Sequence, residues 1–146
     1  MSDLSSTHSA HIRPLDVDEM AEVEDIIEGS RKAGGYVPTS LRLMARRPQM
    51  MRAFSALFGA VMRAPSEIPP QVKWLLAHAV SSSAGCRYCQ AHTAANGNKT
   101  GLDPRKVEAL GLHETNDLFT DIERAVIAFG FAAGEVPNAV TDADFA

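Results

Sequence analysis

Two cysteines and a histidine lie close together in the segment Cys86-Arg87-Tyr88-Cys89-Gln90-Ala91-His92. The chain has only two cysteines, and they lie three positions apart. Residues i and i+3 near the first turn of a helix share a face, so their Cα atoms fall within the range that a disulfide can bridge. The positive end of a helix lowers a thiol pKa, and the thiolate is the nucleophile in peroxide reduction and disulfide exchange. The segment therefore predicts a dithiol redox site.

His92 follows Cys89 by three residues and falls on the same helical face one turn further on. Its imidazole could take a thiol proton or hold the thiolate as an ion pair. Zinc is the other chemistry that these residues allow, with Cys86, Cys89 and His92 as three ligands. A structural zinc site needs a fourth ligand, and His78 or an acid would have to supply it. The sequence favours the redox site without a metal over the zinc site.

Composition narrows the class of protein. The chain has 146 residues, is 45% hydrophobic and carries a net charge of −4, which suits one compact domain. It has no basic tract with interleaved aromatics, so we expect no nucleic-acid partner. Apolar stretches such as Val72–Val80 are too short to cross a membrane. The polar segment 1–10 lacks the apolar core of a secretory signal, so we expect a cytoplasmic protein, in which structural disulfides are rare.

The apolar spacing along the chain predicts helices and gives no convincing alternating strand. We expect a flexible tail over 1–13, followed by a single helical domain over 14–146. The expected helices cover about 17–27, 39–46, 48–62, 70–83, 86–96 and 104–110, with one more from 115 or 116 to a point before Pro137. The segment 70–83 is apolar nearly all round, which places it in the middle of the core. These elements predict an all-α, compact multi-helix bundle with the Cys-x-x-Cys pair at a helix N-terminus.

The last residues predict another helix, with Thr141 as its cap and Asp144 three residues on. The sequence ends before that helix completes two turns. Two interpretations follow: either this end frays, or the domain is truncated at its C-terminus relative to a longer parent. The consequence of truncation would be an exposed apolar patch around Phe129 and Phe131, which favours self-association.

The segment 77–95 resembles the carboxymuconolactone decarboxylase-like superfamily, specifically its AhpD-like alkylhydroperoxidase branch. The residues that carry this resemblance are His78-Ala79-Val80-Ser81 and Gly85-Cys86-Arg87-Tyr88-Cys89-Gln90-Ala91-His92-Thr93. It extends more weakly to 36–41 and 122–131. The resemblance implies an AhpD-like helical fold and a peroxidase or disulfide reductase that needs no bound cofactor and forms homo-oligomers. It also implies that Cys89 attacks a hydroperoxide, Cys86 resolves the product, His92 assists proton transfer, and an external dithiol reduces the disulfide. Local chemistry alone does not choose between the two sulfurs.

Two positions depart from the family pattern. The family places its His four residues after the second Cys, where this chain has Thr93, and a Glu twelve residues before the first Cys, where it has Trp74. His78 lies one helical turn after Trp74. We take His78 as a candidate replacement for the missing acid, against the alternative that it is a core or interface histidine with one hydrogen bond.

These observations favour a thiol-dependent peroxidase that cycles Cys86 and Cys89 between dithiol and disulfide. One alternative is the lactone decarboxylase that gives the superfamily its name, although that chemistry does not use a cysteine pair. A second is a non-catalytic redox-sensing or assembly module.

Overall fold

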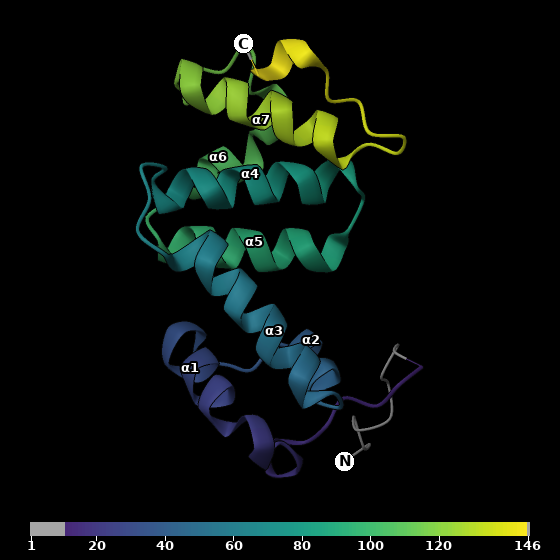
Figure 1. The fold of residues 1–146 in the computed structure, drawn as a ribbon. Helices are drawn as coiled ribbons and strands as arrows, with labels where there is room; N and C mark the ends of the chain where they lie inside the picture. The colour runs from purple at the N-terminus through teal and green to yellow at the C-terminus, as the bar shows by residue number, and fades with distance from the viewer. Residues whose placement is uncertain (1–10, 146) are drawn as a thin grey trace, which may run out of the picture. The chain divides into compact units, whose positions relative to one another are not determined.

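The computed structural model describes residues 11–145, and over that range the protein is helical and contains no strand (Figure 1). The all-α prediction is therefore confirmed. Most of the predicted tail lies outside the described residues. The chain divides into two compact units, residues 1–64 and 65–146, and each is described by itself. Among the described residues, no helix is long and apolar enough to cross a membrane.

The first unit is built from short helices. Two 3-10 turns, Val17–Glu19 and Ala21–Val23, lead into α1 (Glu24–Gly34), which is followed by α2 (Thr39–Met44) and α3 (Pro48–Phe58). A π-helical turn, Gly59–Arg63, continues α3. The helix expected over about 17–27 begins only at Glu24 and continues to Gly34. Gly35 caps it with a φ of 76°, which suits glycine. The buried apolar residues of this unit are Met20, Val23, Ile27, Ala45 and Met51.

The apolar face expected on α3 is only partly used by this unit. Met51 is fully buried, whereas Phe54, Leu57 and Val61 are 44%, 65% and 56% exposed. The apolar spacing predicted a buried face of Met51, Phe54, Leu57, Phe58 and Val61. Burial of that face is confirmed at Met51 and is wrong for Phe54, Leu57 and Val61. The spacing did not indicate how much of that face its own unit covers.

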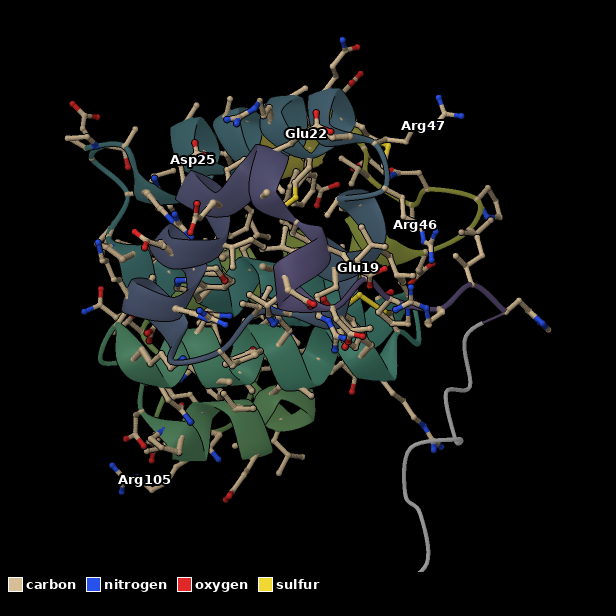
Figure 2. All side chains as sticks on the ribbon, turned by 90° about the horizontal axis from the view of Figure 1, so that it is seen from below. Glu19, Glu22, Asp25, Arg46, Arg47 and Arg105 are labelled. Carbon is tan, nitrogen blue, oxygen red and sulfur yellow. A yellow bond between two sulfur atoms is a disulfide. The ribbon has the colours of Figure 1, made fainter. Side chains whose placement is uncertain are left out.

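Charged side chains lie on the surface of the first unit, where Figure 2 labels Glu19, Glu22 and Asp25. Arg13 donates two hydrogen bonds of 2.8 Å to the Glu19 carboxylate. The hydrogen bonds from Arg13 lower the pKa of Glu19 to about 2. Such exposed pairs fix the course of the segment before α1 and add little to stability.

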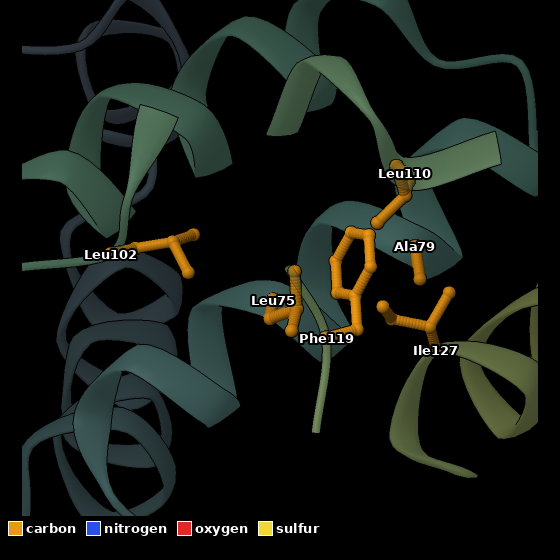
Figure 3. Packing of buried hydrophobic residues seen from close by; sticks show 6 residues of the cluster. All are labelled: Leu75, Ala79, Leu102, Leu110, Phe119 and Ile127. Carbon is orange, nitrogen blue, oxygen red and sulfur yellow. The ribbon is translucent and has the colours of Figure 1, made fainter. Parts of the chain in front are cut away.

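The second unit is organised around α4 (Pro70–Ser83). This helix packs against α5 (Arg87–Lys99) and against α7 (Asp121–Gly134), which lie on opposite sides of it in Figure 1. The short α6 (Pro104–Glu108) connects α5 towards α7. The central place of the apolar segment 70–83 is thus confirmed. Figure 3 shows the buried cluster of this unit, which consists of Leu75, Ala79, Leu102, Leu110, Phe119 and Ile127.

Capping chemistry sets where these helices begin. Asp103 caps α6 by accepting the N–H of Arg105 at 2.9 Å, and Pro104 takes the first helical position as expected. The prediction for the start of α7 was wrong by several residues. Thr120 caps this helix through a capping box with Glu123, so Phe119 lies before the helix, in the core.

Helices α4 and α7 approach so closely that only glycine fits at two positions of α7. A Cβ at Gly130 would lie 2.7 Å from the Ala79 Cβ, and one at Gly134 would lie 2.7 Å from the Val80 carbonyl oxygen. The Ser83 hydroxyl donates a 2.7 Å hydrogen bond to the Phe131 carbonyl across the same interface. This contact fixes one side of α4, whose other side faces the cysteine helix.

The last turn of the described chain spans Asp142–Phe145. Its Phe145 ring is 74% exposed and meets the ring of Phe129 edge to face at 5.7 Å. Thr141 and Asp144 make the capping interaction expected from the sequence. Self-association through this region stays a prediction.

Candidate redox site

Helices α4 and α5 run antiparallel with a definite register. A Cβ at Gly97 would lie 3.4 Å from the Trp74 Cβ, and one turn further along α4 the His78 ring contacts Thr93. One turn beyond that, the Ser81 carbonyl accepts the N–H of Cys86 at 3.0 Å. Residues further along α4 therefore contact residues earlier in α5, as expected for antiparallel helices. This register places the cysteines beside the C-terminal end of α4.

A tight turn at Gly85 produces this arrangement. Gly85 has a φ of 66°, in the left-handed region that favours glycine. Its N–H bonds to the Ser82 carbonyl, while the N–H of Cys86 bonds to that of Ser81. The chain therefore reverses direction immediately after α4. Cys86 is left in an extended conformation, with φ −82° and ψ 91°, as the N-cap of α5.

The two cysteines form a disulfide across the first turn of α5, with their Cα atoms 5.3 Å apart. The N–H of Cys89 donates to the Cys86 sulfur at 3.2 Å. Both cysteines are half-buried. The predicted position of the pair at a helix N-terminus is confirmed.

His78 lies in the interface between α4 and α5. It is 6% exposed, and its Nδ1 is 2.8 Å from the hydroxyl oxygen of Thr93, which is 7% exposed. The same hydroxyl lies 2.9 Å from the Cys89 carbonyl oxygen and 3.1 Å from that of Gln90. When the hydroxyl donates to either carbonyl, Nδ1 of His78 carries the hydrogen and donates to Thr93. Burial lowers the pKa of His78 against an opposing effect of the Gln90 carbonyl, so the ring is neutral at neutral pH.

His92 occupies a different environment, one residue before Thr93. It is half-buried, and its ring lies nearly parallel to that of Tyr88, at 6° and 6.1 Å between centroids. Burial lowers the pKa of His92, and the positive charge of Lys99 lowers it further. A neutral imidazole can accept a proton, whereas it cannot pair with a thiolate as a cation. Its ring contact is with Tyr88, so the part that His92 plays beside the cysteines stays a prediction.

Thr93 is the polar residue of this interface that sequence reasoning did not recognise as a candidate. It was noted only as the position where the family's histidine is absent. Its place one turn after Cys89 was the available signal, because residues i and i+4 share a helix face. In the structure, the imidazole of His78 on α4 contacts Thr93.

Trp74, which stands where the family pattern has a Glu, is part of the core. Trp74 is 8% exposed and backs Gly97, which lies inside α5. We expected α5 to stop at Gly97. The helix instead continues to Lys99. Glycine is needed at position 97 because Trp74 and Leu102 occupy the space that a side chain there would need.

The zinc alternative finds no ligand set in the structure. Over residues 11–145, no group of three or more His, Cys, Asp or Glu side chains is placed to hold a metal ion.

Fold and site together define a small all-helical protein with a redox-capable cysteine pair at the start of an internal helix. The chain belongs to the carboxymuconolactone decarboxylase family, whose family model matches residues 48–132. The resemblance drawn from the sequence is therefore confirmed at the level of the family. No curated protein matches the chain significantly.

Two crystal structures of the debrominase Bmp8 share the fold. The apo structure is 31% identical, with a TM-score of 0.81 over 90% of this chain and 70% of that one. The other contains 2,3,4-tribromopyrrole bound to a variant in which a cysteine is replaced by alanine. It is 29% identical, with a TM-score of 0.83 over 93% of this chain and 72% of that one.

Proposed function

We propose that this protein is a dithiol-dependent reductase that reduces hydroperoxides through a Cys86/Cys89 dithiol–disulfide cycle. The observation that carries the proposal is the disulfide across the first turn of α5, formed by half-buried sulfurs. In the reaction one thiolate takes the terminal oxygen of ROOH, the O–O bond breaks, and ROH leaves. The second sulfur then displaces water from the sulfenic acid and forms the disulfide. The sum is dithiol plus ROOH giving disulfide, ROH and water.

The two histidines have separate roles in this proposal. His92 accepts a thiol proton, because its lowered pKa keeps the ring neutral at working pH. His78 orients the first turns of α5 through Thr93, whose hydroxyl reaches the Cys89 carbonyl. A separate dithiol returns the disulfide to the reduced form by exchange. That step suits the reducing environment of the cytoplasm.

A second candidate substrate is a small brominated aromatic, which the similarity to the debrominase Bmp8 favours. The same cysteines would supply two electrons. One sulfur takes the bromine, the carbon takes a proton, and the second sulfur displaces bromide to form the disulfide. The sum is dithiol plus ArBr giving disulfide, ArH and HBr. Both candidates therefore require the same change at sulfur and differ in the bond that breaks.

The test is a single-turnover measurement with the reduced full chain. The protein is freed of reductant and mixed with one equivalent of cumene hydroperoxide or of 2,3,4-tribromopyrrole. We expect two thiols to be lost per cumyl alcohol formed from the peroxide. Bromide release with the same thiol loss would select the second candidate. The matched control replaces both cysteines by serine and should form neither product.

Unchanged thiols with both substrates would refute the reductase proposal. That result would leave the non-catalytic module or the lactone decarboxylase, and a decarboxylation assay separates these two. Homo-oligomer formation belongs to the same proposal, and light scattering at several protein concentrations measures it directly.

A further inference from the structure

The two cysteines of the pair occupy unequal positions at the start of α5. Cys86 is the N-cap residue, outside the helix, while Cys89 lies within the first turn. A capping side chain accepts the free backbone N–H groups of that turn. The sulfur of Cys86 does this, since it accepts the N–H of Cys89 at 3.2 Å.

One backbone donor of the first turn is directed at the Cys86 sulfur, the N–H of Cys89 at 3.2 Å. The N–H of Gln90 makes the ordinary helical hydrogen bond to the Cys86 carbonyl. The Cys86 sulfur thus acts as the capping acceptor of α5. In this structure the accepting sulfur belongs to the disulfide. On reduction, a first turn that keeps this geometry directs the same N–H at a Cys86 thiolate, and a hydrogen bond to the charged form of an acid favours that form.

The charges of the first turn act in the same direction. This turn contains no acidic residue, and Arg87 follows Cys86 directly. The partial positive charge of the helix N-terminus is therefore not offset by a carboxylate within this turn. The N-cap sulfur sits at this end of the helix, where the field on an anion is strongest.

We propose that Cys86 is the attacking thiolate and Cys89 the resolving thiol, the reverse of the roles that the family resemblance implies. This assignment rests on the proposed reductase function. The Cys86 thiolate forms the S–O bond with the terminal oxygen of the hydroperoxide, and the alkoxide takes a proton and leaves as the alcohol. The Cys89 thiolate then attacks the Cys86 sulfur, and hydroxide leaves and is protonated to water.

Two single variants test the assignment, Cys86→Ser and Cys89→Ser. Serine is itself a good N-cap residue, so Cys86→Ser keeps the start of α5. In each variant one thiol is left, and its pKa is measured from thiolate absorbance at 240 nm. Its rate of alkylation by iodoacetamide is measured at pH 7. We expect a lower thiol pKa and about tenfold faster alkylation in Cys89→Ser, which retains Cys86.

The second measurement locates the oxidised sulfur. Each reduced variant is treated with one equivalent of cumene hydroperoxide in the presence of dimedone, and the adduct is mapped by mass spectrometry. We expect the sulfenic acid at Cys86 in Cys89→Ser and little adduct at Cys89 in Cys86→Ser. Equal pKa values and rates, or a faster and more readily oxidised Cys89, would overturn the assignment.

The two proposals can fail separately. In one outcome, Cys86 has the lower thiol pKa, but the thiols of the unsubstituted protein do not react with the hydroperoxide or the bromopyrrole. That outcome would support Cys86 as the more nucleophilic sulfur and refute the reductase. Efficient turnover with the adduct on Cys89 would support the reductase and refute the assignment.

Discussion

The hydrogen bond between His78 and Thr93 predicts a measurable loss of stability when the hydroxyl is removed. Thr93→Val keeps the shape of the side chain, so it opens no cavity, and it removes the partner that lies 2.8 Å from Nδ1 of His78. Both residues are buried. A buried polar group left without its partner costs about 1–3 kcal/mol.

The structure places the expected cost in the lower part of that range. Burial lowers the pKa of His78, and the Gln90 backbone opposes that effect, so the ring keeps a polar neighbour after the hydroxyl is removed. We expect a loss of about 1–2 kcal/mol, which corresponds to a fall of about 3–8 °C in Tm. Thermal and urea unfolding followed by circular dichroism measure it.

Two controls separate the hydrogen bond from packing. Thr93→Ser keeps the hydroxyl but loses a methyl group. Its loss of stability should therefore be smaller than the loss of a methyl group and of the hydrogen bond together would give. A double-mutant cycle with His78→Phe should give a coupling energy above about 0.5 kcal/mol, because removing both partners leaves no polar group unpaired. A zero coupling energy, or a Thr93→Val protein as stable as the unsubstituted one, would refute the reasoning.

Three further perturbations have defined outcomes. Because the Lys99 charge contributes to the low pKa of His92, Lys99→Gln should raise that pKa in an NMR titration, and an unchanged midpoint would contradict the electrostatic cause. Gly134→Ala should destabilise the protein by about 1–3 kcal/mol in urea unfolding, since its Cβ would overlap the backbone of α4. The matched Gly29→Ala, which meets nothing within 4 Å in the middle of a helix, should instead stabilise by about 0.5–1 kcal/mol, and equal effects would argue against close packing. Hydrogen bonds from Lys106 and Thr120 hold the pKa of Glu123 below its ordinary value of 4.5 despite burial that raises it. The ionised Glu123 carboxylate therefore stabilises the folded protein above about pH 4.5, and this contribution is lost as the pH falls through its folded-state pKa. Glu123→Gln should lower the free energy of unfolding at pH 7 and make it less dependent on pH in the acid range.

Much of the helical architecture could be predicted because its signals are local. A segment that is apolar nearly all round identified α4, and Asp103-Pro104 marked the start of α6. Errors arose where tertiary contacts decide the outcome. Gly97 was expected to end the helix, yet it lies within α5, where its missing side chain leaves room for Trp74 and Leu102.

The candidate site shows the same division. The spacing of Cys86 and Cys89 was enough to place both sulfurs at one helix start. The sequence could not show that the sulfurs are unequal there, because the N-cap position depends on the turn at Gly85. The contact between His78 and Thr93 depends on the register of two helices, which no local pattern encodes.

The two glycines of α7 constrain how this protein can change without losing its site. Because Gly130 and Gly134 bring α7 against the backbone of α4, a larger residue at either position would displace α4. That helix also carries His78 and the carbonyl of Ser81 to the cysteine turn, so a mutation on the far side of the bundle would alter thiol chemistry without touching sulfur. Surveys of activity across random variants should therefore find sensitive positions in α7, in a helix that contributes no reacting group.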